Sequence, residues 1–150
     1  MKDNLPQRKS IRLKEYDYSE PGYYFLTICI KNRLHLLGTI VDSKLQFSKE
    51  GIIVTKYISS IHETYDNMEI DEYTIMPNHI HMILIIHKKE KVTLSHIIQQ
   101  FKGIVTKELG YSIWQKSFHE HIIRNEKQYY IIKQYIQNNV ANWENDRYFA

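Results

Sequence analysis

The most informative stretch for the fold is Pro77-Asn78-His79-Ile80-His81-Met82-Ile83-Leu84. Its apolar continuation predicts a buried strand over 79–86, which begins after a turn at Pro77-Asn78. Side chains two residues apart on a strand point to the same face, so His79 and His81 are expected to lie side by side, with Cα atoms about 6–7 Å apart. Two such imidazoles can share one divalent metal ion. A hydrogen-bonded pair of histidines at a strand end fits the same pattern.

The segments around this stretch predict further strands. They are rich in β-branched and aromatic residues and comprise residues 23–30, 68–76 and 113–124, with a shorter strand at 44–47. Together with 79–86, these segments supply enough strands for one sheet.

Three helices are predicted from apolar residues at helical spacing. Ser48 is placed to cap the first helix, which runs to residue 65. Thr93 caps the second helix, and Gly110 ends it. Asn125 caps the last helix, expected over 126–143. The order β, α, β, β, α, β, α predicts an α+β fold of the ferredoxin-like, split-βαβ kind, with helices packed on an antiparallel sheet.

Length and composition predict one domain over residues 1–150, with a basic N-terminal arm of about residues 1–15. Hydrophobic residues make up 43% of the 150 residues and charged residues 25%, which excludes a disordered or fibrous chain. The single cysteine, Cys29, excludes an intrachain disulfide and a cysteine-rich zinc module. The sequence has no apolar stretch of about 18 residues and no secretory signal pattern, so a cytoplasmic protein without membrane contact is expected.

Charge is unevenly distributed along the chain. The net charge is only +3, but cations gather in the N-terminal arm and over 88–107, and acidic residues gather over 63–72. This segregation suits a polyanionic partner, and the 12 tyrosines and two tryptophans can supply stacking surfaces for bases. Solvated helix faces and core aromatics account for the same composition, so nucleic-acid binding is permitted rather than demonstrated.

Two more patterns carry potential chemistry. His119-Glu120-His121 repeats the spacing of the first histidine pair and competes with it for a metal, but polar residues on an edge strand near a substrate explain this pattern better than a second metal site does. Tyr135 and Asn139 are four residues apart on the predicted last helix and flank its apolar stripe. A tyrosine there can attack a phosphodiester, and an amide oxygen one turn later can complete a metal site.

Taken in order along the chain, these segments resemble the one-tyrosine HUH transposases of small bacterial insertion sequences. The resemblance is strongest to the REP-associated tyrosine transposases, and the hydrophobic residue between the two histidines is Ile80. It covers nearly the whole chain and is carried by residues 16–28, 76–81, 101–106, 113–115, 119–125 and 135–139.

The resemblance implies an HUH endonuclease of ferredoxin-like fold that uses Mg²⁺ or Mn²⁺ and acts on single-stranded DNA next to a hairpin. By this resemblance His79, His81 and Asn139 are the metal ligands and Tyr135 is the nucleophile. Related transposases often have glutamine where this chain has Asn139, and members of this branch commonly have proline where it has Val140. Insertion-sequence members are dimers with the tyrosine helix supplied in trans and the REP-associated branch includes monomers, so both a monomer and a homodimer are open.

The reaction implied is attack of the Tyr135 phenol on phosphorus, which gives a 5′-phosphotyrosine and a free 3′-OH that can later reverse the reaction. His119, Glu120 and His121 are candidates for the general base. The residues expected to contact DNA are Arg8, Lys9, Arg12, Lys14, Lys102, Lys107, Trp114, His119, His121 and Arg124.

Three other functions compete with a transposase. A catalytically inactive, domesticated DNA-binding protein of the same fold would keep the binding surface and form no adduct. A metal-dependent hydrolase or nuclease with a water nucleophile would work without Tyr135. A purely structural interaction module leaves the paired histidines unexplained.

Overall fold

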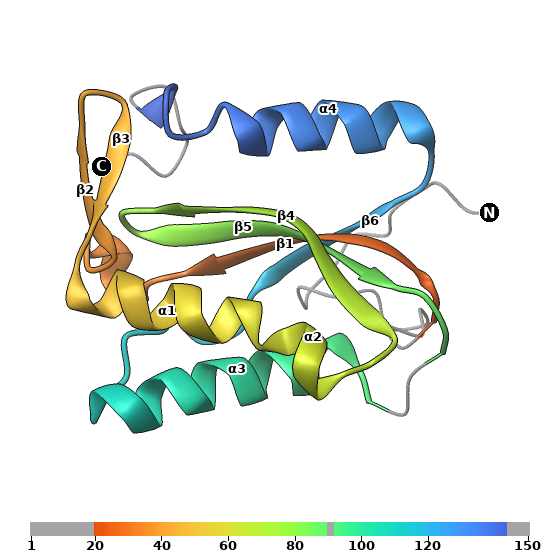
Figure 1. The fold of residues 1–150 in the computed structure, drawn as a ribbon, viewed down its shortest axis with the longest axis horizontal. Helices are drawn as coiled ribbons and strands as arrows, with labels where there is room; N and C mark the ends of the chain where they lie inside the picture. The colour runs from red at the N-terminus through yellow and green to blue at the C-terminus, as the bar shows by residue number, and fades with distance from the viewer. Residues whose placement is uncertain (1–19, 90–91, 144–150) are drawn as a thin grey trace.

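Four antiparallel strands form the central sheet, in the order β4-β5-β1-β6 (Figure 1). The computed structural model describes residues 20–89 and 92–143. The strands are β1 (Gly22–Cys29), β4 (Met68–Met76), β5 (His79–Ile86) and β6 (His119–Ile123). The connection from β1 to β4 passes over β5, and the connection from β5 to β6 passes over β1. These two split crossovers confirm the predicted ferredoxin-like arrangement.

Helices cover both faces of this sheet (Figure 1). On one face lie α1 (Lys49–Ser59), α2 (Ile61–Thr64) and α3 (Leu94–Leu109), and on the other lies α4 (Glu126–Gln137). None of the helices within the described residues is long and apolar enough to cross a membrane.

The predicted helix caps are confirmed. The side chains of Ser48, Thr93 and Asn125 each accept a hydrogen bond from a backbone N–H in the first turn. Gly110 ends α3 in the left-handed conformation, with φ of 85°.

The alternation of side chains along β5 divides the core in two. Ile80, Met82 and Leu84 belong to the large core beneath α1–α3, while Ile83 and Ile85 pack with Ile136 of α4. His79 and His81 alternate with the first set, so they lie on the face that α4 covers. Every residue of β5 is buried, because the strand pairs with β1 and β4 along its length and is covered on both faces.

Before the last helix, the structure differs from the sequence-based expectation at four places. The first helix breaks at Ser60, whose hydroxyl donates to the carbonyl of Tyr57. The segment 113–124 is a strand only over β6, with one isolated bridge from Trp114 to Ile30. A bulge between Ile70 and Glu72 interrupts the alternation of β4. An unpredicted strand, β2 (Gly38–Val41), pairs with β3 (Lys44–Phe47), the short strand that was predicted.

The turn that precedes His79 accepts two backbone hydrogen bonds, and a third supports one of the two donors. Ile30 donates its N–H to the carbonyl of Asn78, and Leu37 donates to the carbonyl of Pro77. Ser48, at the start of α1, donates in turn to the carbonyl of Leu37. The end of β1, the loop after it and α1 therefore all position the start of β5.

Gly51 is required where α1 approaches this loop. A Cβ at position 51 would lie 2.1 Å from the carbonyl oxygen of Leu37, a backbone atom that cannot swing away. We expect Gly51→Ala to lower the free energy of unfolding by about 1–3 kcal/mol or more. The matched control is Gly103→Ala on α3, where a Cβ meets nothing within 4 Å and alanine should stabilise by about 0.5–1 kcal/mol. Urea unfolding of both variants checks the pair, and equal effects would contradict the close contact.

Candidate active site

His79 and His81 form a buried pair at the start of β5. Their exposed fractions are 0% and 2%, and their ring centroids are 4.6 Å apart. The predicted side-by-side placement on one face of the strand is what the structure contains.

Neighbouring side chains orient both rings through Nδ1. The Nδ1–H of His79 donates to Oδ1 of Asn78 at 2.8 Å, and Nδ1 of His81 is hydrogen-bonded to Oγ1 of Thr27 at 2.9 Å. Thr27 lies opposite His81 in the pairing of β1 with β5. Fixing Nδ1 in this way leaves Nε2 of each ring as the atom that can ligate or accept a proton.

The electrostatic environment keeps His79 neutral. Burial, with a smaller contribution from the neighbouring His81, lowers the pKa of His79 from 6.5 to about 2. Neutral imidazole is the form that binds metal ions.

Helix α4 places Tyr135 against this pair. The phenol oxygen of Tyr135 lies 3.4 Å from Nε2 of His81, and the two ring centroids are 5.3 Å apart. Phe25 of β1 meets the tyrosine ring edge-on, at 6.4 Å between centroids. Tyr135 is 40% exposed, so solvent or a substrate can reach its ring.

Polar contacts with β4 hold α4 in place. The hydroxyl of Tyr129 donates to Asp71 at 2.6 Å, and the amide of Gln137 donates to Glu72 at 2.9 Å. Ile136 is the residue of α4 that is fully buried against the sheet. All these contacts lie within one chain, so the tyrosine and the histidine pair meet without a second copy.

Asn139 lies in a turn after α4, which corrects the expectation of one helix from 126 to 143. The helix ends at Gln137, and the N–H of Asn139 donates to the carbonyl of Ile136, three residues back. Asparagine side chains compete for backbone hydrogen bonds, which favours a helix end at Asn138-Asn139. Residues 135–143 still cover the histidine pair. Tyr135 contacts His81, and Trp143 packs on His79 with ring centroids 6.3 Å apart.

Two buried atoms at this end of the sheet form no hydrogen bond with the protein. They are Nε2 of His79 and Oδ1 of Asn139, each in a residue that makes other contacts. No cluster of three or more His, Cys, Asp or Glu side chains suited to a metal occurs in 20–89 and 92–143. A cation here would therefore be held by two imidazoles and an amide, a donor set compatible with Mn²⁺ or Mg²⁺ when water and phosphate oxygens complete it.

The second histidine pair is divided by the alternation of β6. His119 is exposed and His121 is half-buried on the α4 face, whereas Glu120 is buried on the opposite face beside Leu26. Glu120 therefore cannot act as the general base for Tyr135. Burial, with a smaller effect of the Arg124 charge, lowers the pKa of His121, and a hydrogen bond with Gln128 opposes this shift.

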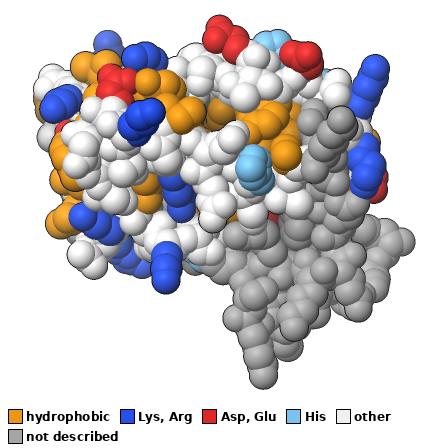
Figure 2. Space-filling model, turned by 90° about the horizontal axis from the view of Figure 1, so that it is seen from below, with side chains coloured by type: hydrophobic (Ala, Val, Ile, Leu, Met, Phe, Trp, Pro, Cys, Tyr) orange, Lys and Arg blue, Asp and Glu red, His pale blue; other side chains and the backbone are white. Residues whose placement is uncertain are grey.

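Several residues expected to contact DNA lie away from this site. Trp114 is buried against Phe101, and its indole N–H donates to the carbonyl of Lys102, so it offers no exposed stacking face. The ammonium of Lys102 donates to two carbonyls of the loop before β6, and Lys107 is exposed on the same helix. Figure 2 shows this helical face, with Lys and Arg side chains spread over it rather than gathered in one groove.

The remaining residues of that prediction divide between two places. Arg124 follows β6, near His121, and its N–H donates to the side chain of Gln128 at the start of α4. Arg8, Lys9, Arg12 and Lys14 lie outside the described residues.

Sequence reasoning missed the side chains that support the histidines. Asn78 stands next to His79 in sequence, and a polar residue at that turn was a usable signal. Thr27 is separated from His81 by 54 positions, so only the pairing of β1 with β5 reveals the contact.

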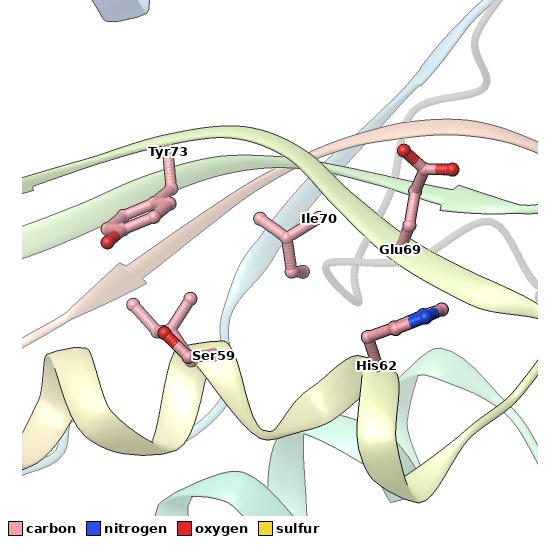
Figure 3. A pocket seen from close by; sticks show the side chains of 6 residues that line it. Ser59, His62, Glu69, Ile70 and Tyr73 are labelled. Atoms are coloured by element: carbon pink, nitrogen blue, oxygen red, sulfur yellow. The ribbon is translucent and has the colours of Figure 1, made fainter.

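A separate cavity of about 400 Å³ opens between the helical layer and β4 (Figure 3). It lies on the opposite face of the sheet from His79 and His81. Its lining residues are Ile58, Ser59, His62, Glu69, Ile70 and Tyr73.

Comparison with known families identifies the family to which the chain belongs. The family model described as "Transposase IS200 like" matches residues 19–139, a span from the start of β1 to Asn139. The chain belongs to the IS200-like transposase family.

Other proteins resemble this transposase over most of its length. An uncharacterized protein of Haemophilus influenzae is 36% identical over 171 positions, which cover 97% of this chain and 95% of that protein. A solved structure of a REP-associated tyrosine transposase bound to a REP hairpin matches with a TM-score of 0.70 and 25% identity, over 88% of this chain and 73% of that one. A putative transposase from Deinococcus radiodurans shares the fold, with a TM-score of 0.53 and 18% identity, over 85% of this chain and 95% of that one.

The buried state of His79 makes stability depend on pH. In the unfolded chain this imidazole is protonated below about pH 6.5, whereas in the folded protein it stays neutral down to about pH 2. The unfolded state therefore binds more protons as pH falls, and we expect this group to remove about 2 kcal/mol of the free energy of unfolding between pH 7 and pH 5. Urea unfolding in EDTA should show that loss in the natural protein and lack it in His79→Gln. Identical pH dependence of the two proteins would contradict burial of a neutral imidazole.

Proposed function

We propose that the protein cleaves and rejoins single-stranded DNA through a covalent bond to Tyr135. The phenol oxygen attacks phosphorus, the tyrosine keeps the 5′ phosphate, and a free 3′-OH is released for a later strand transfer. The observation that carries the proposal is the 3.4 Å approach of the Tyr135 phenol oxygen to Nε2 of His81, beside the buried His79. Membership of the IS200-like transposase family supports the same reaction class.

His79, His81 and Asn139 are the residues that would hold a divalent cation, Mg²⁺ or Mn²⁺. Such a cation supplies Lewis acid chemistry, polarising a phosphate oxygen and lowering the pKa of a phenol close to it. Asn78 and Thr27 hold the two imidazoles in the orientation that leaves each Nε2 available.

The phenol itself needs assistance. A tyrosine has a pKa near 10, so at neutral pH nearly all of the phenol is protonated. The Tyr135 ring packs edge-to-face with Phe25, and its oxygen contacts His81. These two contacts fix the direction from which the phenol oxygen approaches a bound phosphate. Such positioning contributes to the rate because the attacking oxygen is already aligned.

The DNA partner we propose is a single strand next to a hairpin. The REP-associated tyrosine transposase that this chain resembles was solved with a REP hairpin bound. The exposed ring of Tyr135 and the partly exposed β6 side of the same face provide a path by which an extruded strand can reach the site.

One chain is sufficient to assemble this site. Tyr135 on α4 reaches His81 on β5 of the same chain. We therefore propose that a monomer carries out the reaction and that a homodimer is not required for it. We propose that residues 1–150 act as a single domain, in the cytoplasm where the DNA lies.

The test is capture of the covalent intermediate. The protein is mixed with 5′- or 3′-labelled single-stranded oligonucleotides that carry candidate hairpins, with Mg²⁺ or Mn²⁺, and the products are separated on a denaturing protein gel. We expect a metal-dependent adduct that resists SDS and disappears in Tyr135→Phe and in His79→Ala.

Binding of the same oligonucleotides, measured by fluorescence anisotropy, serves as the control for a blank gel. Tight hairpin binding with no adduct would favour the domesticated DNA-binding protein. Cleavage that persists in Tyr135→Phe would show that water is the nucleophile and would overturn the proposal.

Thr27 offers a separate test of the metal site. Thr27→Val keeps the shape of the side chain and removes the hydroxyl that holds Nδ1 of His81. We expect the affinity for Mn²⁺ to fall by about 10- to 100-fold, because support of a ligating imidazole commonly contributes that much. Thr27→Ser retains a hydroxyl and should bind as the natural protein does. Calorimetric titration measures both, and unchanged affinity in Thr27→Val would rule out this supporting role.

A further inference from the structure

The edge strand β6 presents His119 in the same row as His81. Thr27 of β1 pairs with His81 on one side and with His119 on the other. Side chains of directly paired residues lie on the same face of a sheet, and here it is the face that carries α4 (Figure 1). Because adjacent strands are about 4.8 Å apart, the Cα atoms of the two histidines are separated by about 10 Å.

Thr27 lies between these two histidines in the row of paired residues. Its side chain is short, and its hydroxyl is hydrogen-bonded to Nδ1 of His81. Helix α4 makes most of its contacts with β4 and β5, and it meets β6 at Ile123 and His121 rather than at His119. His119 is accordingly exposed, whereas His81 is buried. The exposed His119 is therefore the member of this row that a phosphodiester strand can reach from the β6 side.

Tyr135 contacts the His81 end of this row, and His119 forms the other end. The phenol oxygen reaches in from α4, 3.4 Å from Nε2 of His81, and His119 rises from the far edge of the sheet. In-line displacement at phosphorus requires the attacking and leaving oxygens to be on opposite sides of the phosphorus atom. An oxygen displaced by Tyr135 therefore departs toward β6.

Resting on the function proposed above, we propose that His119 donates the proton to the departing 3′ oxygen. The bond from phosphorus to the phenol oxygen forms as the bond from phosphorus to O3′ breaks. The electron pair of the broken bond stays on O3′, which takes a proton from the His119 imidazolium, while the phenolic proton passes to solvent. In strand transfer the neutral imidazole of His119 takes a proton from the attacking 3′-OH, and the phenol is reprotonated from solvent.

The other polar residues of β6 are less suited to this role. Glu120 is buried on the opposite face, beside Leu26. His121 lies in the next row on the same face, opposite Phe25, and is hydrogen-bonded to Gln128 of α4. Among the three candidates from the sequence, His119 alone shares a row with His81.

The experiment replaces the bridging 3′ oxygen at the cleaved phosphate with sulfur. A thiol has a pKa near 8.5, far below that of a sugar hydroxyl, so a thiolate departs without needing a proton. We expect His119→Ala to slow cleavage of the natural hairpin oligonucleotide by about 10²- to 10⁴-fold. On the 3′-sulfur oligonucleotide, the same variant and the natural protein should cleave at nearly equal rates. His96→Ala, an exposed histidine at the start of α3 on the opposite face, should leave both rates unchanged.

The possible outcomes separate this role from the function on which it rests. An equal loss on the oxygen and sulfur substrates would assign His119 to binding or structure and overturn the inference, as would no loss on either. In both cases the adduct formed by the natural protein shows that the tyrosine chemistry itself holds. Absence of that adduct with hairpin oligonucleotides that the natural protein binds would instead refute the proposed function.

Discussion

The pairing of β5 between β1 and β4 is the constraint on which the rest of the structure depends. It buries every residue of the strand and forces neighbouring side chains to opposite faces. A shift of register by one residue would turn His79 and His81 into the large core and expose Ile80 and Met82 to the α4 face. The apolar side chains of β5, which are buried on both faces, thus fix the register of the strand. The register in turn fixes the face to which the two imidazoles point.

The helix that carries the tyrosine is held differently from the sheet. Polar contacts such as those from Tyr129 to Asp71 and from Gln137 to Glu72 attach α4, and its buried apolar contribution centres on Ile136. Elements held by few buried apolar contacts open at lower free energy than a core strand. This contrast suits the proposed reaction, in which the histidines stay fixed while the tyrosine, once joined to a DNA strand, has to accommodate that strand and its replacement.

Local pattern was enough to predict the four strands of the central sheet, the caps and the common face of His79 and His81, because each of these depends on residues within a few positions. Thr27 could not be predicted as the partner of His81, since their contact exists only through strand pairing across 54 positions. Trp114 was expected to stack on DNA and is instead a core residue, because aromatic composition does not distinguish an interior face from an exposed one. The end of α4 before Asn139 depends on side-chain competition for the backbone, which helical periodicity does not register.

The placement of two imidazoles in the interior has a cost that explains their surroundings. A buried polar ring without partners is destabilising, and a buried cationic ring much more so. Asn78 and Thr27 form hydrogen bonds with the Nδ1 atoms. Burial also keeps His79 uncharged. Both effects lower the free-energy cost of placing two imidazoles in the interior. A protonated pair would repel a cation and hold a phosphate as an ion pair. A neutral His79 beside His81, with both Nε2 atoms directed away from their supports, instead suits the metal ligation proposed above, so the burial that lowers stability at acid pH also fits the proposed chemistry at neutral pH.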